Sequence, residues 1–182
     1  MRSASQIIDE EFTNAVVELF EFYSDSAVKP QFLDRVASAE LLRKEADNYA
    51  RSNEMVTSSI GLCGDQVRCS IGLLSNVDTI NALCQGLADS PTDWVGELTN
   101  QLAGRFKNNL AAFHVDCQMG LPVSVQGLQL GFTTGCSEQT ILAVQMSLGT
   151  VIVLLHVNIT DDSSWEHHPD LVCADEGSLH LF

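Results

Sequence analysis

The sequence predicts an α+β domain in which long helices pack on one side of a mostly antiparallel sheet built from two hairpins. Hydrophobic residues recur every three or four positions in two long segments, which is typical of amphipathic helices. In two other stretches they recur at every second position, and a glycine stands where a tight turn would join two strands. We expect this domain to span residues 1–159, followed by an acidic C-terminal extension over residues 160–182.

The composition is strongly acidic. The 182 residues include 24 Asp and Glu against 9 Lys and Arg, a net charge of −15, and 45% of them are hydrophobic. Such a chain is long and apolar enough for one sizeable core. Its negative charge repels phosphate backbones and anionic lipids, which argues against nucleic-acid or membrane-surface binding. Because the first residues, MRSASQIIDEEF, lack the apolar stretch of a secretory signal, we expect a cytoplasmic protein.

The cysteines and the longest apolar stretch have ordinary explanations. We expect the six cysteines to be reduced thiols, since the chain has no export signal and no C-x-x-C motif.

Residues 140–159 are apolar enough to suggest a membrane span, but polar residues interrupt them and Val and Ile are frequent in their second half. This pattern predicts a buried hairpin instead.

The first predicted elements are a helix and a hairpin. The helix runs from Ser5 to about Tyr23, and residues 29–53 fit either a helix or an early strand. A hairpin with Gly64-Asp65 at the centre of its turn would place Cys63 and Cys69 on opposite faces, which argues against a disulfide between them. Five apolar residues would share its inner face: Ile60, Leu62, Val67, Cys69 and Ile71.

A short helix and a second hairpin complete the sheet layer. Ser75 and Asp78 form a capping-box pattern, which predicts a helix that ends near Gly86. The second hairpin would join residues 141–148 to residues 151–159 about Gly149-Thr150. In that register one face is wholly apolar: Leu142, Val144, Met146, Leu148, Val151, Val153, Leu155 and Val157.

A longer helix is predicted from Pro91 to about Phe113, with Ser90 as its N-cap. Its apolar residues fall on one broad side, and a narrow stripe lies opposite: Asp93, Glu97, Asn100, Gly104 and Asn108. A glycine inside a helix costs about 1 kcal/mol relative to alanine. Gly104 therefore suggests either that a binding partner approaches the helix backbone closely or that another helix packs there.

This stripe resembles a family signature. The spacing Asp93-x-x-x-Glu97-x-x-Asn100-x-x-x-Gly104 is similar to that of the CheX/CheC/FliY chemotaxis phosphatases. Residues 60–72, IGLCGDQVRCSIG, resemble the first hairpin of that family, and residues 120–127, GLPVSVQG, resemble the segment after its signature helix. With residues 12–22, which resemble the first family helix, the likeness covers most of residues 5–159. One complete motif favours a CheX-like over a CheC-like arrangement.

The resemblance implies a CheC-like fold and a phosphatase that hydrolyses the aspartyl phosphate of a CheY-type response-regulator receiver domain. Mg²⁺ would be supplied by that partner, so the protein would need no cofactor of its own. By the same resemblance, Asn100 would orient the attacking water and Glu97 would pair with a receiver lysine. Gly104 would leave room for the partner, Asp93 would assist docking, and the protein would be a homodimer.

Several alternatives stay open. Asp93 could serve only as the capping carboxylate of its helix. The chain could also be a non-catalytic adaptor that keeps the fold and binds a signalling protein through the same helix. A second Glu-x-x-Asn, Glu11 to Asn14, lies where CheC-type members carry an additional site, but Glu18 occupies the place of its glycine and we interpret it as chance. No metal site is predicted, because one cluster matches no closed zinc pattern: His167, His168, Asp170 and Cys173.

Overall fold

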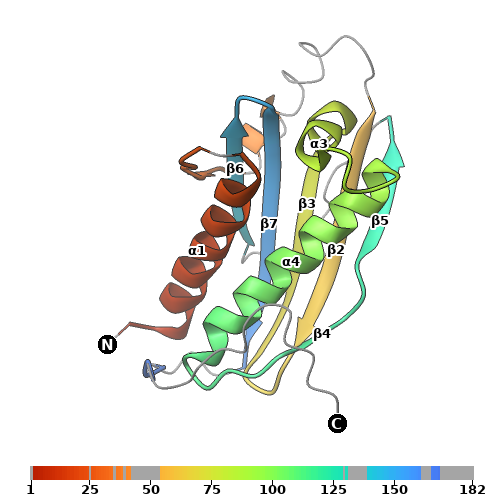
Figure 1. Ribbon diagram of the computed structural model, residues 1–182. Coiled ribbons are helices and arrows are strands. Elements are labelled where there is room, and N and C mark those ends of the chain that lie inside the picture. Colours follow the sequence, from red (N-terminus) through yellow and green to blue (C-terminus); the bar gives the residue numbers. More distant parts are fainter. Residues whose placement is uncertain are drawn as a thin grey trace.

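In the computed structural model, one seven-stranded antiparallel sheet carries the long helices on one of its faces (Figure 1). The structure describes residues 2–24, 26–34, 36–38, 40–41, 54–128, 130, 139–160 and 165–168. The predicted fold class is confirmed. The elements in chain order are α1 (Ala4–Ser24), β1 (Gln31–Phe32), β2 (Met55–Cys63), β3 (Val67–Asn76), α3 (Val77–Cys84), α4 (Pro91–Ala111), β4 (Gln118–Met119), β5 (Val123–Gly127), β6 (Gln139–Met146) and β7 (Gly149–Ile159).

The two predicted hairpins form the centre of the sheet. Its strands follow the spatial order β1-β6-β7-β3-β2-β4, and β5 pairs with β2. Both β4 and β5 therefore lie along the side of β2 that faces away from β3. In this arrangement β5 is an edge strand within the part of the chain that the structure describes.

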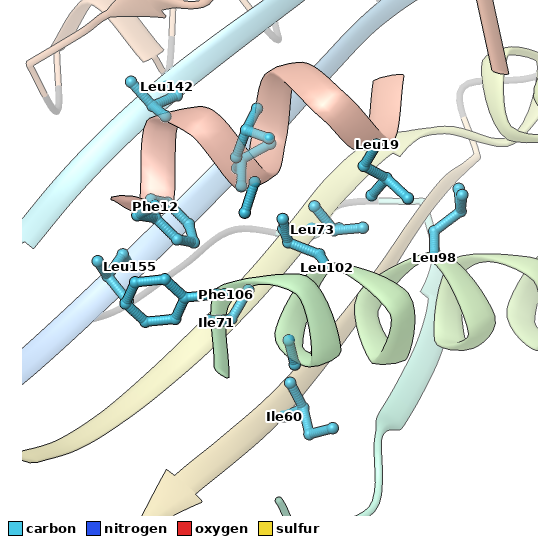
Figure 2. Packing of buried hydrophobic residues seen from close by; sticks show 14 of the residues in the cluster. Phe12, Leu19, Ile60, Ile71, Leu73, Leu98, Leu102, Phe106, Leu142 and Leu155 are labelled. Carbon is cyan, nitrogen blue, oxygen red and sulfur yellow. The ribbon is translucent and has the colours of Figure 1, made fainter. Parts of the chain in front are cut away.

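The main core lies between the sheet and the paired helices α1 and α4. Figure 2 shows Phe12 of α1 and Phe106 of α4 facing each other above the strands; their ring centroids are 5.3 Å apart in an edge-to-face arrangement. Both side chains are fully buried, which contributes about 2–3 kcal/mol each. A smaller cluster lies on the opposite face of the sheet: Met55, Leu74, Ile141, Ala143, Ile152 and Leu154. The core thus fixes which side of α4 turns away from the sheet.

The helix starts were predicted with mixed success. The Ser90 cap of α4 is confirmed, since its hydroxyl oxygen accepts the backbone N–H of Asp93. The predicted cap of α3 is wrong, because the side chain of Asn76 accepts the N–H of Thr79 at 2.7 Å. Ser75 instead stays in β3, where its hydroxyl donates to a backbone carbonyl of β7 at 2.6 Å. The helix then ends at Cys84, two residues before the predicted glycine.

The first hairpin turns at Asp65-Gln66 rather than at Gly64-Asp65. The N–H of Gly64 donates to the carbonyl of Val67 at 2.9 Å, and Cys63 pairs with Arg68. The register is therefore shifted by two residues from the prediction. A shift by an even number keeps every side chain on its predicted face, because side chains alternate with period two. The predicted inner face is indeed buried, and Cys63 and Cys69 lie on opposite faces.

The second hairpin turns at Ser147-Leu148, because Met146 pairs with Gly149. Gly149 therefore belongs to β7 rather than to the turn. Its φ of +131° favours glycine, and a Cβ there would collide with the Oγ1 of Thr79 at the start of α3. The shift from the predicted register is again even, so the predicted apolar face remains in the core.

Three further segments complete the description. Of the ambiguous residues 29–53, residues 31–32 form β1 and residues 36–38 and 40–41 are helical, while 42–53 lie outside the described residues. In the extension, Trp165 packs against the core and the N–H of His168 donates to the carbonyl of Ala112 at 2.8 Å. The division at residues 159 and 160 stays a prediction.

Two findings concern the membrane and the thiols. None of the helices that the structure describes has the length and apolar character needed to cross a membrane. Cys136 and Cys173 lie outside the described residues. The remaining cysteines are free thiols: Cys63, Cys69, Cys84 and Cys117.

Candidate functional site

The polar stripe of α4 lies on the side of the helix that faces away from the core. Asp93 and Glu97 are exposed, and Asn100, Gly104 and Asn108 are partly exposed. The predicted division of this helix is therefore confirmed, since the residues opposite the stripe are buried: Trp94, Val95, Leu98, Leu102, Phe106, Leu110 and Phe113. One rigid helix thus presents a carboxylate and a carboxamide three residues apart, which are neighbours on a helix surface.

Asp93 takes part in the cap of α4. The hydroxyl of Ser90 donates to the Asp93 carboxylate at 2.7 Å and accepts the Asp93 N–H at 3.1 Å. A negative charge in the first turn also interacts favourably with the helix dipole. The Asp93 carboxylate thus holds the hydroxyl of the capping residue Ser90, and it is exposed.

Glu97 is held by a neighbouring amide. Its Oε1 accepts a hydrogen bond from Nε2 of Gln101 at 2.8 Å, and Oε1 of Gln101 accepts one from the hydroxyl of Tyr23 at 2.8 Å. Sequence reasoning missed both partners. Gln101 stands four residues after Glu97, a spacing at which helical side chains interact, so this signal was available. Tyr23 comes from α1, and no local pattern points to it.

Asn100 and Gly104 line an open hollow of about 470 Å³ beside α1. The side-chain amide of Asn100 has no hydrogen-bond partner among the residues that the structure describes. The other lining residues come from α1, α4 and β4: Phe22, Tyr23, Gln101, Arg105, Asn108 and Met119. The hollow therefore combines aromatic and thioether walls with amide groups.

Gly104 leaves a gap in this surface. A Cβ built at Gly104 would meet no described heavy atom within 4 Å, apart from those of its own helix turn and chain neighbours. No described helix of this chain therefore packs against Gly104. Among the described residues, nothing fills the space above the helix backbone at this position.

Charges of both signs surround the stripe. The carboxylates of Asp93 and Glu97 lie toward the amino end of α4, and Arg105 lies beyond Gly104 in the hollow wall. The Arg105 guanidinium is 3.9 Å from the carboxylate of Glu18 on α1. The amino-terminal end of the stripe therefore suits a cationic group of a partner.

The second Glu-x-x-Asn on α1 differs from the stripe of α4. The Asn14 amide lies 3.5 Å from the Glu11 carboxylate of the same motif, and the backbone carbonyl of Glu11 accepts a hydrogen bond from Asn109 at 3.2 Å. Glu18 occupies the place of the glycine and is exposed. A carboxylate thus stands where α4 has open space.

No metal centre is seen in the described residues, where no three His, Cys, Asp or Glu side chains are grouped to hold an ion. The ring of His167 packs against Phe113, with centroids 5.2 Å apart, and His168 packs against His114 at 4.1 Å. Asp170 and Cys173, which the sequence places near these two histidines, lie outside the described residues.

Comparison with solved structures identifies the fold. A CheC-like superfamily protein from Shewanella is 20% identical, with a TM-score of 0.63, and the match covers 84% of this chain and 97% of that one. The chemotaxis protein CheX from Vibrio vulnificus is 21% identical, with a TM-score of 0.63 and coverages of 83% and 96%. CheX in a complex with CheY, BeF₃ and Mg²⁺ from Borrelia burgdorferi is 16% identical, with a TM-score of 0.61 and coverages of 83% and 97%. No family model and no curated protein matches the sequence. The chain thus has the CheC-like fold found in CheX chemotaxis proteins.

Proposed function

We propose that this chain, whose fold is that of CheX chemotaxis proteins, binds a phosphorylated CheY-type receiver domain and accelerates hydrolysis of its aspartyl phosphate. The observation that carries the proposal is the joint exposure of Glu97 and Asn100 on α4, next to the open space at Gly104. A CheX of the same fold has been crystallised with CheY. On this proposal the protein would act in the cytoplasm.

The chemistry suits a carboxamide. In the reaction, a water oxygen bonds to phosphorus, the bond between phosphorus and the aspartyl oxygen breaks, and the electron pair of that bond returns to the carboxylate. The products are the free aspartate and inorganic phosphate, and the proton that the water loses passes to phosphate or to solvent. Phosphoryl transfer passes through a loose transition state, so catalysis needs mainly a water held in line with the leaving carboxylate. An amide both donates and accepts hydrogen bonds, and Asn100 would use it to orient this water. The receiver would supply the Mg²⁺, which neutralises charge on the phosphoryl oxygens.

The rest of the stripe would dock the receiver. Glu97 would pair with a lysine of the receiver near its phosphorylation site, a charge-assisted contact that also fixes orientation. Gly104 would let the partner approach the backbone of α4, and Asp93 would add a second negative charge to the contact. Because this chain carries a net charge of −15, long-range attraction to an acidic receiver is weak and local contacts must determine affinity.

We also propose a homodimer formed by edge-to-edge pairing of β5. Within the described residues β5 pairs on one side only, with β2. Val123 and Val125 are 64% and 49% exposed on this strand, and Leu121 beside it is 87% exposed. An apolar strand with an open edge is a ready template for another strand, so a second copy of β5 would cover it.

The function is tested by the decay of a phosphorylated receiver with and without this protein. Receiver domains from the same organism, phosphorylated with acetyl phosphate, are incubated with Mg²⁺, and the remaining aspartyl phosphate is measured over time. We expect faster decay with at least one receiver. Measurable binding of a receiver without any acceleration would favour the adaptor alternative, and absence of both would contradict the proposal.

A further inference from the structure

A chain of two hydrogen bonds links the exposed carboxylate of Glu97 to the protein interior. The hydroxyl of Tyr23 donates to Oε1 of Gln101 at 2.8 Å, and Nε2 of Gln101 donates to Oε1 of Glu97 at 2.8 Å. The two bonds agree in direction, because the amide accepts with its oxygen and donates with its nitrogen. If the amide were flipped, its oxygen would face the carboxylate, so the two contacts together fix one orientation of Gln101.

The inner end of this chain is rigid. Tyr23 is buried, and its ring packs edge-on against Trp94 with centroids 5.2 Å apart and an interplanar angle of 88°. The ring of Phe22 also packs edge-on against the ring of Tyr23, with centroids 5.0 Å apart and an interplanar angle of 88°. These contacts leave little freedom to the tyrosine ring, so its hydroxyl is a fixed anchor for the Gln101 amide.

The outer end carries the group that the proposed function uses for docking. A free, exposed glutamate samples several rotamers, and a partner that binds one of them must restrict the others. We propose that Gln101 is a positioning residue, which transmits the fixed position of Tyr23 to Glu97 and presents the carboxylate to the receiver in one orientation. This inference rests on the proposed function, because it assigns a role within the same site.

A double-mutant cycle tests the inference. Gln101→Leu keeps side-chain bulk and helix propensity but removes both hydrogen bonds, and it is made with Glu97 intact and in a Glu97→Ala background. Tyr23→Phe keeps the ring contacts and removes only the anchoring hydroxyl. Each variant is measured for affinity to a receiver loaded with beryllofluoride and Mg²⁺, and for kcat and KM with the phosphorylated receiver.

With Glu97 intact, Gln101→Leu should weaken binding and raise KM by roughly three- to tenfold, as expected for one ordering contact to a charged group. The kcat should stay within about twofold, since Asn100 is untouched, and Tyr23→Phe should give a smaller change in the same direction. In the Glu97→Ala background, Gln101→Leu should have no further effect. An equal loss in both backgrounds would overturn the inference, because Gln101 would then contact the receiver itself; unchanged binding with Glu97 intact would also overturn it.

A measurement without the receiver separates this inference from the proposed function. Scalar couplings between Hα and Hβ of Glu97 report its χ1 populations by NMR. We expect one dominant rotamer in the wild-type protein and averaged couplings in both Gln101→Leu and Tyr23→Phe. If no receiver binds while the couplings behave in this way, the proposed function fails but the ordering of the Glu97 side chain by Gln101 stands. Averaged couplings in the wild-type protein would overturn the positioning.

Discussion

Ser90 and Asp93 hold each other at the start of α4 through two hydrogen bonds, one from hydroxyl to carboxylate and one from backbone N–H to hydroxyl. The pair fixes the first turn of the helix that carries the candidate site. The stripe residues follow this turn at helical spacing. The position of the first turn therefore determines the side of α4 on which Glu97 and Asn100 lie.

We expect Ser90→Ala to lower the free energy of unfolding by about 1 kcal/mol, because it leaves a backbone N–H of the first turn without its acceptor. Urea titration followed by circular dichroism measures this change. Ser147→Ala, in the exposed turn between β6 and β7, is the control and should change stability by less than about 0.5 kcal/mol. Equal stability of the two variants would show that the cap contributes little.

Asn100→Ala should remove most of the acceleration of receiver dephosphorylation, on the order of a hundredfold, because the water would lose its orienting group. Stability should change little, since the side chain lies on the side of α4 away from the core. The receiver decay assay and urea titration measure the two quantities. Asn14→Ala removes the exposed amide of the second Glu-x-x-Asn on α1 and is the matched control, which should retain full activity. An active Asn100→Ala protein would refute the site assignment.

Two substitutions at Gly104 separate the stability of α4 from its proposed contact with the receiver. Gly104→Ala should raise the free energy of unfolding by about 0.5–1 kcal/mol, because alanine is the better helix former and the added Cβ has free space. The Gly104→Leu protein should also fold, but it should bind the receiver more weakly, since the leucine side chain would occupy the space that the partner needs. Calorimetric titration with a beryllofluoride-loaded receiver compares them, and undiminished binding by Gly104→Leu would exclude a close approach at this position.

Val123→Lys should convert the proposed dimer to a monomer, because it places a charge on the edge strand where a second copy would pair. Sedimentation velocity over a range of protein concentrations measures the change. Val36→Lys is the control, because Val36 is 70% exposed and Val123 is 64% exposed. A wild-type protein that sediments as a monomer at all concentrations would contradict the dimer.

The stability should fall at alkaline pH because of Cys69. Burial, with a further contribution from Cys117, raises the pKa of Cys69 from 9.0 to about 12. Between these values the unfolded chain has released the proton that the native chain still holds, so the free energy of unfolding should decrease by up to about 1.4 kcal/mol per pH unit. Urea titrations from pH 8 to 11, roughly the accessible part of this range, measure the slope.

Cys69→Ala tests the source of this slope. It should lower stability at neutral pH through lost burial and should flatten the alkaline slope. An unchanged slope in Cys69→Ala would show that another group causes the alkaline loss.

The sequence predicted the fold well where periodicity alone determines the structure. Periodicity predicted the buried sides of α1 and α4 and the inner faces of both hairpins. It could do so because each element of a core turns one apolar face toward that core. The exact turns were predicted wrongly. Asp65-Gln66 and Ser147-Leu148 are less typical turn pairs than the glycine-containing alternatives, and contacts with distant residues such as Thr79 decide where Gly149 lies.

The candidate site was predicted in part for a related reason. The stripe of α4 is local in sequence, so helical spacing alone placed Glu97, Asn100 and Gly104 on one side. The support of Glu97 by Tyr23 depends on how α1 packs beside α4, because Tyr23 and Gln101 have a sequence separation of 78. No periodicity within either helix encodes that pairing. The apolar walls of the hollow were missed because they too come from separate elements.

Gly149 lies so close to Thr79 that the β6–β7 hairpin limits how α3 can be placed. Thr79 lies in the first turn of α3, and α3 leads through a short connection into the cap of α4. A side chain at position 149 would collide with Thr79 unless the hairpin or the first turn of α3 moved. Because α3 leads into the cap of α4, the close seating of this hairpin bears on the position of the helix that carries the candidate site.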